Sequence, residues 1–336
     1  MKALVIGLGS MGKRRIRNLK ALGLTDIAGV DPRGDRRDEA AGKYDIATFA
    51  NFAEALSVLN PSLLVISTSP EKHMQFAFEG LRHGLPCFIE ASVVDSEGVL
   101  KLHEATVGRG PIMAPSCTMR YFPGPIKVKD IVRSGVLGKI LSFNYQTGQY
   151  LRDWHPWEDI SDYYVSRRET GGAREIVPFE LTWLDEIFGS SVPIRSLCRN
   201  IGDLGVDIDD IYYAWLRYPG GVLANITIEV LSRPQATREL RVTGSSGQLV
   251  FNADNNLVRV ATVEEPAWKR YELSRGRAEA GYINPEEPYV REMSDFLEAV
   301  RSGDQSKFPN NLLDDYRILQ TLTALEKLSE EGVDEL

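Results

Sequence analysis

The chain has 336 residues, of which 43% are hydrophobic and 26% charged, and its formal net charge is −8. This composition is that of an ordinary globular protein with room for two domains. It contains no long basic run, so nucleic-acid partners are not expected. No apolar run approaches 18 residues and the first residues show no signal-peptide pattern, so we expect a cytoplasmic protein without a membrane partner. The three cysteines lie far apart, which predicts neither disulfides nor a metal site.

The N-terminal stretch joins a short apolar run to a glycine-rich loop. Residues 3–6 predict a buried strand, and Ile16, Leu19 and Leu22 predict one face of the helix that follows. A GxGxxG pattern between a strand and a helix indicates dinucleotide binding, because glycines permit the tight turn and close approach to a pyrophosphate, and the helix N-terminus attracts it. The residues expected to hold the phosphates are Gly7, Gly9, Ser10, Met11 and Gly12. A glycine-rich turn of another α/β protein is the structural alternative.

A second apolar run over residues 27–30 ends in Asp31. An acid about 20 residues beyond the glycines is placed to bind the adenosine ribose hydroxyls. Its charge would repel a 2′-phosphate, so the expected cofactor is NAD. Arg33, Arg36 and Arg37 follow closely and leave NADP possible, because an arginine can pair with that phosphate.

Strands and helices alternate through the first 120 residues. Apolar runs at 63–66, 86–90 and 111–114 predict further buried strands, and helices are predicted over 34–44, 51–59, 70–83 and 95–108. The predicted fold class is α/β, with a Rossmann doubly wound parallel sheet. Ligands of such sheets lie at the carboxyl ends of the strands. Besides the glycine loop and Asp31, those ends carry Ser67, Thr68, Ser69, Glu90 and residues 116–120.

The pattern changes after about residue 120. A helix over 123–134 precedes alternating segments at 225–230 and 239–243 and short strands at 249–251 and 256–261, which predict an open, mostly antiparallel sheet. Helices are predicted at 286–302 and 311–329. We therefore predict a dinucleotide-binding domain over 1–120 and an α+β domain for substrate binding and oligomerisation over 121–336, whose terminal helices can pack back on the first domain. One face of such an open sheet is commonly buried against a partner subunit.

Several segments carry a wider resemblance: GLGSMGKRRIRNLKALG at 7–23, the turn and helix start at 67–73, the strand ending in Glu90, residues 137–164, Gly171-Gly172 and residues 244–249. Over nearly its whole length the chain resembles the glucose–fructose oxidoreductase and inositol dehydrogenase family (Gfo/Idh/MocA). The resemblance implies hydride transfer between NAD(P) and a sugar-like or polyol carbon, and a homodimer or homotetramer formed through the C-terminal sheet. It also implies that His73 lies near the cofactor ribose.

Two catalytic positions of that family carry other residues here. Ala91 stands at the lysine of the family's Glu-Lys-Pro motif, beside the cofactor, and Phe179 stands at the histidine that acts as general acid and base. Thr182 occupies the place of an aspartate. A hydroxyl proton must leave as hydride leaves the carbon, and a base eases that step. The two replacements therefore leave nucleotide binding intact but put ordinary alcohol dehydrogenation in question.

Few side chains of the second half are left to move a proton. The candidates are Glu180, His155 and Tyr163, and each has a structural alternative as a helix or loop residue. The stretch 153–159 is either a platform on which tryptophans stack against a sugar or a surface loop held by them. Predicted substrate-binding residues are Arg120, Tyr121, Trp154, Trp157, Tyr164 and Arg168. Arg120 suits a carboxylate or phosphate, or alternatively an interdomain salt bridge.

Three functions are compatible with these residues. The preferred one is an NAD(P)-dependent oxidoreductase acting on a sugar, nucleotide sugar or similar small polar molecule, with an altered acid/base set. The second is an NAD(P)-binding protein without dehydrogenase activity, used as a sensor or non-catalytic partner. The third is an enzyme that keeps NAD bound and performs chemistry with no net oxidation.

Overall fold

The computed structural model describes residues 1–156 and 158–332. The chain divides into two compact units. Unit 1 consists of residues 1–121 and 276–316, and unit 2 of residues 122–275 and 317–336. These units differ from the predicted domains mainly in residues 276–316, which pack with the N-terminal part of the chain.

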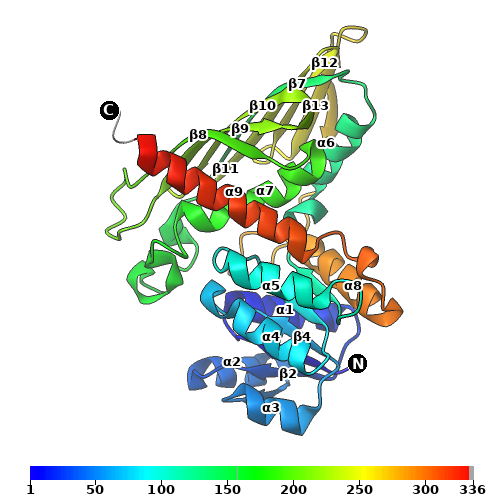
Figure 1. The fold of residues 1–336 in the computed structure, drawn as a ribbon, viewed down its shortest axis with the longest axis vertical. Coiled ribbons are helices and arrows are strands. Elements are labelled where there is room, and N and C mark those ends of the chain that lie inside the picture. Colours follow the sequence, from blue (N-terminus) through cyan, green and yellow to red (C-terminus); the bar gives the residue numbers. More distant parts are fainter. Residues whose placement is uncertain (157, 333–336) are drawn as a thin grey trace. The chain divides into compact units, whose positions relative to one another are not determined.

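Unit 1 is built around a six-stranded parallel sheet in the order β3-β2-β1-β4-β5-β6. Figure 1 labels β2 and β4 of this sheet together with the helices of the unit. The strands are β1 (Ala3–Ile6), β2 (Ile27–Val30), β3 (Ala47–Phe49), β4 (Leu63–Ile66), β5 (Cys87–Ile89) and β6 (Met113–Pro115). The helices are α1 (Ser10–Ala21), α2 (Gly34–Tyr44), α3 (Phe52–Leu59), α4 (His73–Arg82), α5 (Ser96–Thr106) and α8 (Glu287–Ser302). This confirms the predicted Rossmann arrangement.

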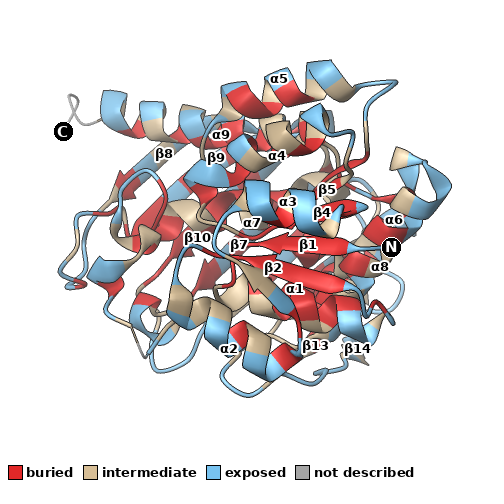
Figure 2. Cartoon of the chain, turned by 90° about the horizontal axis from the view of Figure 1, so that it is seen from below, coloured by how far each residue is buried: buried red, intermediate tan, exposed pale blue. Residues whose placement is uncertain are grey.

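The central strands of unit 1 are buried along their whole length. Every residue of β1, β2 and β4 is buried, as the red strands in Figure 2 show. A parallel strand covered on both faces needs apolar side chains at successive positions, which explains the continuous apolar runs in the sequence. Strand β3 has only three residues and is only partly buried, so it carries no continuous apolar run that would have predicted it.

The segment 276–316 belongs to unit 1 because α8 supplies part of its core. The ring of Phe88 on β5 packs edge-on against Phe296 of α8, with centroids 5.7 Å apart, and against Phe308, at 6.2 Å. Phe296 and Met293 are fully buried. A helix this far along the chain therefore covers the sheet that the first residues build.

Unit 2 is built on an eight-stranded sheet in the order β14-β13-β12-β11-β7-β10-β9-β8. Its strands are β7 (Ile140–Gly148), β8 (Val192–Arg199), β9 (Ile211–Tyr218), β10 (Val222–Glu229), β11 (Thr237–Gly244), β12 (Gly247–Asn252), β13 (Leu257–Thr262) and β14 (Lys269–Glu272). Neighbours run antiparallel except β7 and β10, which pair in parallel at the centre. This confirms the prediction of a mostly antiparallel sheet. The helices of unit 2 are α6 (Pro123–Arg133), α7 (Ala173–Phe188) and most of α9 (Leu312–Glu331).

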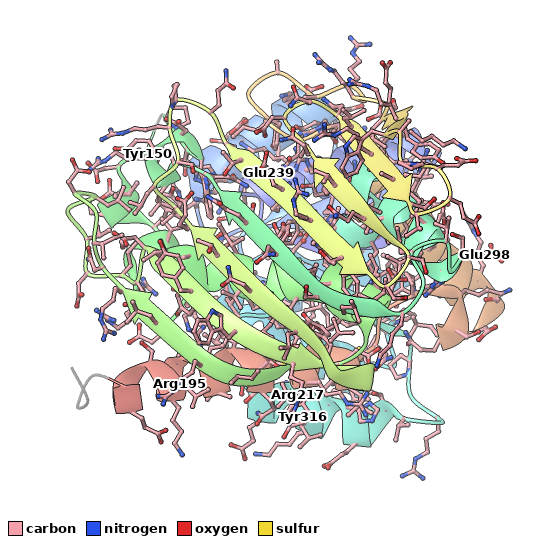
Figure 3. The ribbon with its side chains drawn as sticks, turned by 90° about the horizontal axis from the view of Figure 1, so that it is seen from above. Tyr150, Arg195, Arg217, Glu239, Glu298 and Tyr316 are labelled. Carbon is pink, nitrogen blue, oxygen red and sulfur yellow. The ribbon has the colours of Figure 1, made fainter. Side chains whose placement is uncertain are left out.

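The two faces of this sheet differ. On the inner face, Tyr145 and Ile226 are buried, and Trp183 of α7 packs edge-on against the Tyr145 ring at 5.5 Å. Figure 3 looks onto the outer face, where Arg217 and Glu239 are labelled. This outer face also presents Trp215, which is 59% exposed. Alternation along each strand sends one set of side chains to the helices and the other to the outside.

Candidate functional site

The loop between β1 and α1 forms a cradle in which two glycines make close backbone contacts. Gly7 has φ of +90°, and a Cβ at this position would lie 2.4 Å from the carbonyl oxygen of Ser67. A Cβ at Gly12 would lie 1.8 Å from the carbonyl oxygen of Gly7. Helix α1 has no side-chain cap and no acid in its first turn, so its own first residues leave its positive end open to an anion. These residues fit the pyrophosphate of a dinucleotide.

Asp31 is fixed beside this cradle by two backbone donors. Its Oδ2 accepts a hydrogen bond from Leu8 N at 2.8 Å, and Oδ1 accepts one from Arg33 N at 2.9 Å. A carboxylate oxygen has a second lone-pair site, so each can still accept from a ribose hydroxyl. Arg36 Nη1 lies 3.8 Å from Asp31 Oδ2 and 3.5 Å from where a Cβ of Gly9 would stand. The Asp31 carboxylate and the Arg36 guanidinium therefore border the loop together.

The other two arginines after β2 form hydrogen bonds with groups close to them in the sequence. Arg33 donates two hydrogen bonds to Asp35, at 3.1 and 2.6 Å. Arg37 Nη1 donates to the carbonyl oxygens of Asp31 and Pro32, at 2.8 and 2.9 Å. These contacts leave Arg36 as the arginine of this group that is nearest to the glycine loop.

His73 shapes the turn that follows β4. Its Nε2 lies 3.0 Å from the carbonyl oxygen of Thr68, to which the neutral ring donates. Burial lowers the pKa of His73 because it disfavours the charged ring. Ser67 Oγ donates to Glu90 at 3.3 Å and Ser69 Oγ to Glu71 at 2.7 Å, so both serines also stabilise this turn. Contacts of this turn with a cofactor remain predictions.

Glu90, predicted to contact the cofactor, belongs to a buried ion network. Arg15 donates to it from Nε at 2.6 Å and from Nη2 at 3.0 Å. Arg15 is fully buried and forms a second ion pair, at 2.9 Å, with Glu292 of α8. Burial alone would lower the pKa of Arg15, but the two carboxylates hold it above its ordinary value. The network fixes the end of β5, next to Ala91, which has no group that could move a proton.

In unit 2, the segment 160–170 packs against the first turn of α7. Tyr164 Oη donates to Glu175 Oε1 at 2.7 Å, and Thr170 Oγ1 donates to the Tyr164 carbonyl at 2.7 Å. Burial raises the pKa of Glu175 to about 7, against the opposing effect of the Tyr164 hydrogen bond. The Tyr163 ring stacks on His155 with centroids 4.8 Å apart. Burial, followed by the charges of Glu175 and Glu158, raises the pKa of Tyr163.

The structure therefore brings together three of the predicted residues, His155, Tyr163 and Tyr164, and adds Glu175. Sequence reasoning missed Glu175, although an acid in the first helical turn after Gly171-Gly172 was a usable signal. Trp154 lies before that segment and is half-buried. Trp157 lies outside the described residues. Arg168 is engaged elsewhere, since it pairs with Asp207 at 2.7 Å and Asp209 at 3.0 Å.

Glu180, predicted as a catalytic base, is instead held in the core between α7 and the sheet. It is fully buried, and it accepts hydrogen bonds from Tyr145 Oη at 2.5 Å, Trp183 Nε1 at 2.8 Å and Arg238 Nη2 at 2.6 Å. Three donors within the protein therefore satisfy this fully buried carboxylate, as is usual for buried polar groups. These contacts argue against the predicted catalytic role of Glu180.

Arg120 and Tyr121, predicted to bind substrate, are used in the packing of unit 1. Arg120 donates to the carbonyl oxygen of Pro309 and to Asn310 Oδ1. Tyr121 Oη donates to Asp295 of α8 at 2.9 Å. Both side chains thus attach the segment before α6 to the C-terminal part of unit 1, and these contacts argue against the predicted role.

Two domain descriptions of one family match the sequence. The NAD-binding Rossmann fold of an oxidoreductase family matches residues 1–101, and the GFO/IDH/MocA C-terminal domain matches residues 126–250. Together they cover more than half of the chain. The fold and the cradle define an NAD-binding oxidoreductase. The chain belongs to the Gfo/Idh/MocA family, as its motifs had indicated. A search of curated protein sequences finds no match.

Solved structures with this fold include several with a bound nicotinamide cofactor. An oxidoreductase from Agrobacterium radiobacter with NAD+, L-tartaric acid and magnesium has a TM-score of 0.85 at 12% identity, over 99% of this chain and 97% of that one. Levoglucosan dehydrogenase with NADH and levoglucosan has a TM-score of 0.82 at 15% identity, over 98% and 97%. GenD2 from gentamicin A biosynthesis with NAD has a TM-score of 0.81 at 16% identity, over 99% and 95%. At these identities the similarity shows the fold.

Proposed function

We propose that this protein is an NAD-dependent dehydrogenase that oxidises a hydroxyl group of a sugar or similar small polar molecule, or reduces the corresponding carbonyl. The observation that carries the proposal is the cradle, in which Gly7 and Gly12 leave the α1 N-terminus open beside the fixed Asp31 carboxylate. Bound NAD would supply the hydride acceptor. The chain's own residues would hold the pyrophosphate at α1 and the adenosine ribose at Asp31.

The preference for NAD over NADP follows from the groups around Asp31. Its carboxylate would repel a 2′-phosphate, and the nearby arginines Arg33 and Arg37 are already engaged with Asp35 and with backbone carbonyls. Calorimetry with each cofactor tests this. We expect wild type to bind NAD+ at least tenfold more tightly than NADP+, and Asp31→Ala to reduce that ratio. Asp26→Ala is the control, because it changes an exposed acid at the other end of β2 from Asp31. No affinity for either cofactor would contradict the proposal.

A sugar-like substrate is supported by the types of several described residues of unit 2 that lie between positions 154 and 175. Trp154, Tyr163 and Tyr164 offer aromatic faces for the C–H edges of a sugar, and Glu175 and Glu158 offer acceptors for hydroxyls. Levoglucosan and L-tartaric acid, bound in two of the similar structures, are hydroxyl-rich small molecules. The test is a screen of sugars, polyols and hydroxy acids for reduction of NAD+, which is monitored by the absorbance of the NADH that forms.

The second candidate is an NAD-binding protein without dehydrogenase activity. It is favoured by Ala91 and Phe179, which stand where the family's lysine and histidine are expected and cannot move a proton. The same screen separates the two candidates. Tight NAD binding without turnover of any compound would favour the second one, and turnover would exclude it. Release of a product without net NADH would indicate chemistry in which NAD is oxidised and reduced in one cycle.

The outer face of the unit 2 sheet is proposed to pair with a second copy of the chain. It exposes Trp215, Leu223 and Tyr213 on neighbouring strands β9 and β10, beside polar residues such as Arg217. Apolar groups gathered on one sheet face are a common mark of a subunit interface. We propose a homodimer or homotetramer and a cytoplasmic location. No helix within residues 1–156 and 158–332 has the length and apolar composition that crossing a membrane requires.

A further inference from the structure

Residues 276–286 form a loop of unit 1 that leads into helix α8 and is closed at its base. Arg277 N donates to Glu287 Oε1 at 3.0 Å, and Glu286 N donates to the carbonyl oxygen of Arg277 at 3.0 Å. Gly276 permits the turn, since its φ is +67° and a Cβ would lie 2.6 Å from Glu287 Oε2. A compact loop whose ends are held together presents its middle residues from a defined position.

Two arginines of α1 attach this loop to the helix. Arg14 donates to Glu286 Oε1 at 3.0 Å and to the carbonyl oxygen of Asn284 at 3.2 Å. Arg17 donates to Glu286 Oε1 at 3.0 Å. Both guanidinium groups also lie over the Tyr282 ring, 4.5 and 4.3 Å from its centroid. These contacts place the middle of the loop, with Tyr282, against α1.

The Tyr282 hydroxyl reaches the first residue of α1. Its Oη donates to the carbonyl oxygen of Ser10 at 2.8 Å and accepts a hydrogen bond from Arg17 Nη1 at 3.3 Å. The Ser10 carbonyl belongs to the same planar peptide unit as Met11 N–H. An N–H in the first turn of a helix has no partner within the helix, and it is one of the donors that an anion at the N-terminus uses. Tyr282 therefore holds the peptide unit that carries a phosphate donor.

Attachment of the loop to α1 does not require this hydroxyl. The ion pairs of Glu286 and the face of the Tyr282 ring already provide it, and a phenylalanine ring would offer a similar face to the two cations. The hydroxyl instead joins a chain of hydrogen bonds that begins at the Arg17 cation and ends at the Ser10 carbonyl. Hydrogen bonds in such a chain polarise one another, which makes the N–H of the last peptide unit a better donor.

We propose that Tyr282 is a positioning residue for the cofactor, because through the Ser10 carbonyl it orients Met11 N–H for the pyrophosphate of NAD. This deepens the proposed function and rests on its NAD site. The loop 276–286 and the cofactor are then coupled, since both favour the same orientation of one peptide unit. Coupling of this kind is reciprocal, so NAD stabilises the attached loop by the factor by which the loop strengthens NAD binding.

The first experiment compares three ligands on the full chain by calorimetry and ligand-observed NMR. In Tyr282→Phe we expect the Kd values of NAD+ and ADP-ribose, which both carry the pyrophosphate, to rise about 3–10-fold, as for the loss of one hydrogen bond. Adenosine has no phosphate, so its Kd should change less than about twofold. Tyr44→Phe is the matched control. It removes the other tyrosine hydroxyl that Arg17 contacts, at 3.1 Å, and should leave all three Kd values unchanged.

Two results of this comparison would overturn the proposal and leave the proposed function standing. Equal rises in Kd for all three ligands would mean that Tyr282 acts only through the stability of unit 1. Unchanged binding of NAD+ and ADP-ribose would mean that its hydroxyl does not position the donor. Wild type that binds neither NAD+ nor ADP-ribose would overturn the proposed function and this role together.

The second experiment tests the reciprocal effect by hydrogen exchange. In wild type saturated with NAD+, we expect peptides from 276–286 to exchange more slowly than in the free protein, whereas saturation with adenosine should not slow them. In Tyr282→Phe saturated with NAD+, the glycine loop should still be protected, but most of the NAD+ effect on 276–286 should be lost. The same NAD+ effect on 276–286 in both proteins would overturn the coupling through Tyr282.

Discussion

Replacing Arg15 by methionine tests the buried ion network of unit 1. The substitution keeps most of the side-chain volume but leaves Glu90 and Glu292 without their shared cation. Removing one partner of a buried pair costs about 3–5 kcal/mol, because the remaining charge stays desolvated. For a unit of this size, that corresponds to a fall in Tm of roughly 6–20 °C.

A matched control lies two residues away on the same helix. Lys13 pairs with Glu39 at 2.7 Å, nearly the same distance as the 2.6 Å between Arg15 and Glu90, but the Glu39 side chain is 50% exposed. Exposed pairs contribute about 0–1 kcal/mol, so Lys13→Met should change little. Hydrogen exchange of peptides from unit 1, followed through urea unfolding, measures both variants without assuming that the two units unfold together.

The destabilisation should also depend on pH. Burial raises the pKa of Glu292, and Arg15 opposes that rise, so the pKa rises further in Arg15→Met. A carboxyl with a higher pKa in the folded state binds a proton on folding, and stability therefore falls as pH rises from about 4.3, its unfolded value, through the folded pKa. We expect a larger gap from wild type at pH 8 than at pH 5. A variant within about 1 kcal/mol of wild type at pH 8, or a gap that widens toward pH 5, would refute this account of the network.

Three further perturbations test other parts of the molecule. Gly12→Ala should abolish NAD+ binding in calorimetry because its Cβ would lie 1.8 Å from Gly7 O, whereas Gly42→Ala, with open space around its Cβ, should bind normally. Burial lowers the pKa of His73, so below about pH 6.5 the unfolded chain binds a proton at this histidine that the folded chain does not. The stability of unit 1, measured by hydrogen exchange, should therefore fall as the pH is lowered through this range. His73→Gln should weaken this dependence of stability on pH. Trp215→Asp should reduce the mass in light scattering to the monomer value of 37.5 kDa, whereas Val58→Asp should not, since Val58 is an exposed apolar residue on α3. An assembly unchanged in Trp215→Asp would exclude this sheet face as the interface.

Local sequence patterns were sufficient to predict most of the helices and strands and the glycine loop between β1 and α1. Every residue of β1 and β4 is apolar because both faces of each strand are covered. This continuous apolar run can be recognised in the sequence without knowing which segments pack against it. The glycines at 7 and 12 and the acid at 31 lie within one strand–helix–strand unit. Their geometry therefore follows from a short segment of chain, and the structure agrees with it.

The sequence alone could not predict which side chains from distant segments would contact one another. Periodicity places Glu180 on a helix, but it does not say that Tyr145 and Arg238 will meet its carboxylate from two strands far along the chain. The same holds for Arg15 and Glu292.

The sequence by itself determined the dinucleotide-binding half and the class of the second sheet, because contacts between neighbours in the chain decide those features. Only the tertiary structure separated Glu180, whose oxygens are all engaged, from Glu175, whose Oε2 has no hydrogen-bond partner within residues 1–156 and 158–332. The proton affinity of a carboxyl group depends on its burial and on hydrogen-bond donors from elsewhere in the fold. Neither can be inferred from the residues that flank it in the sequence.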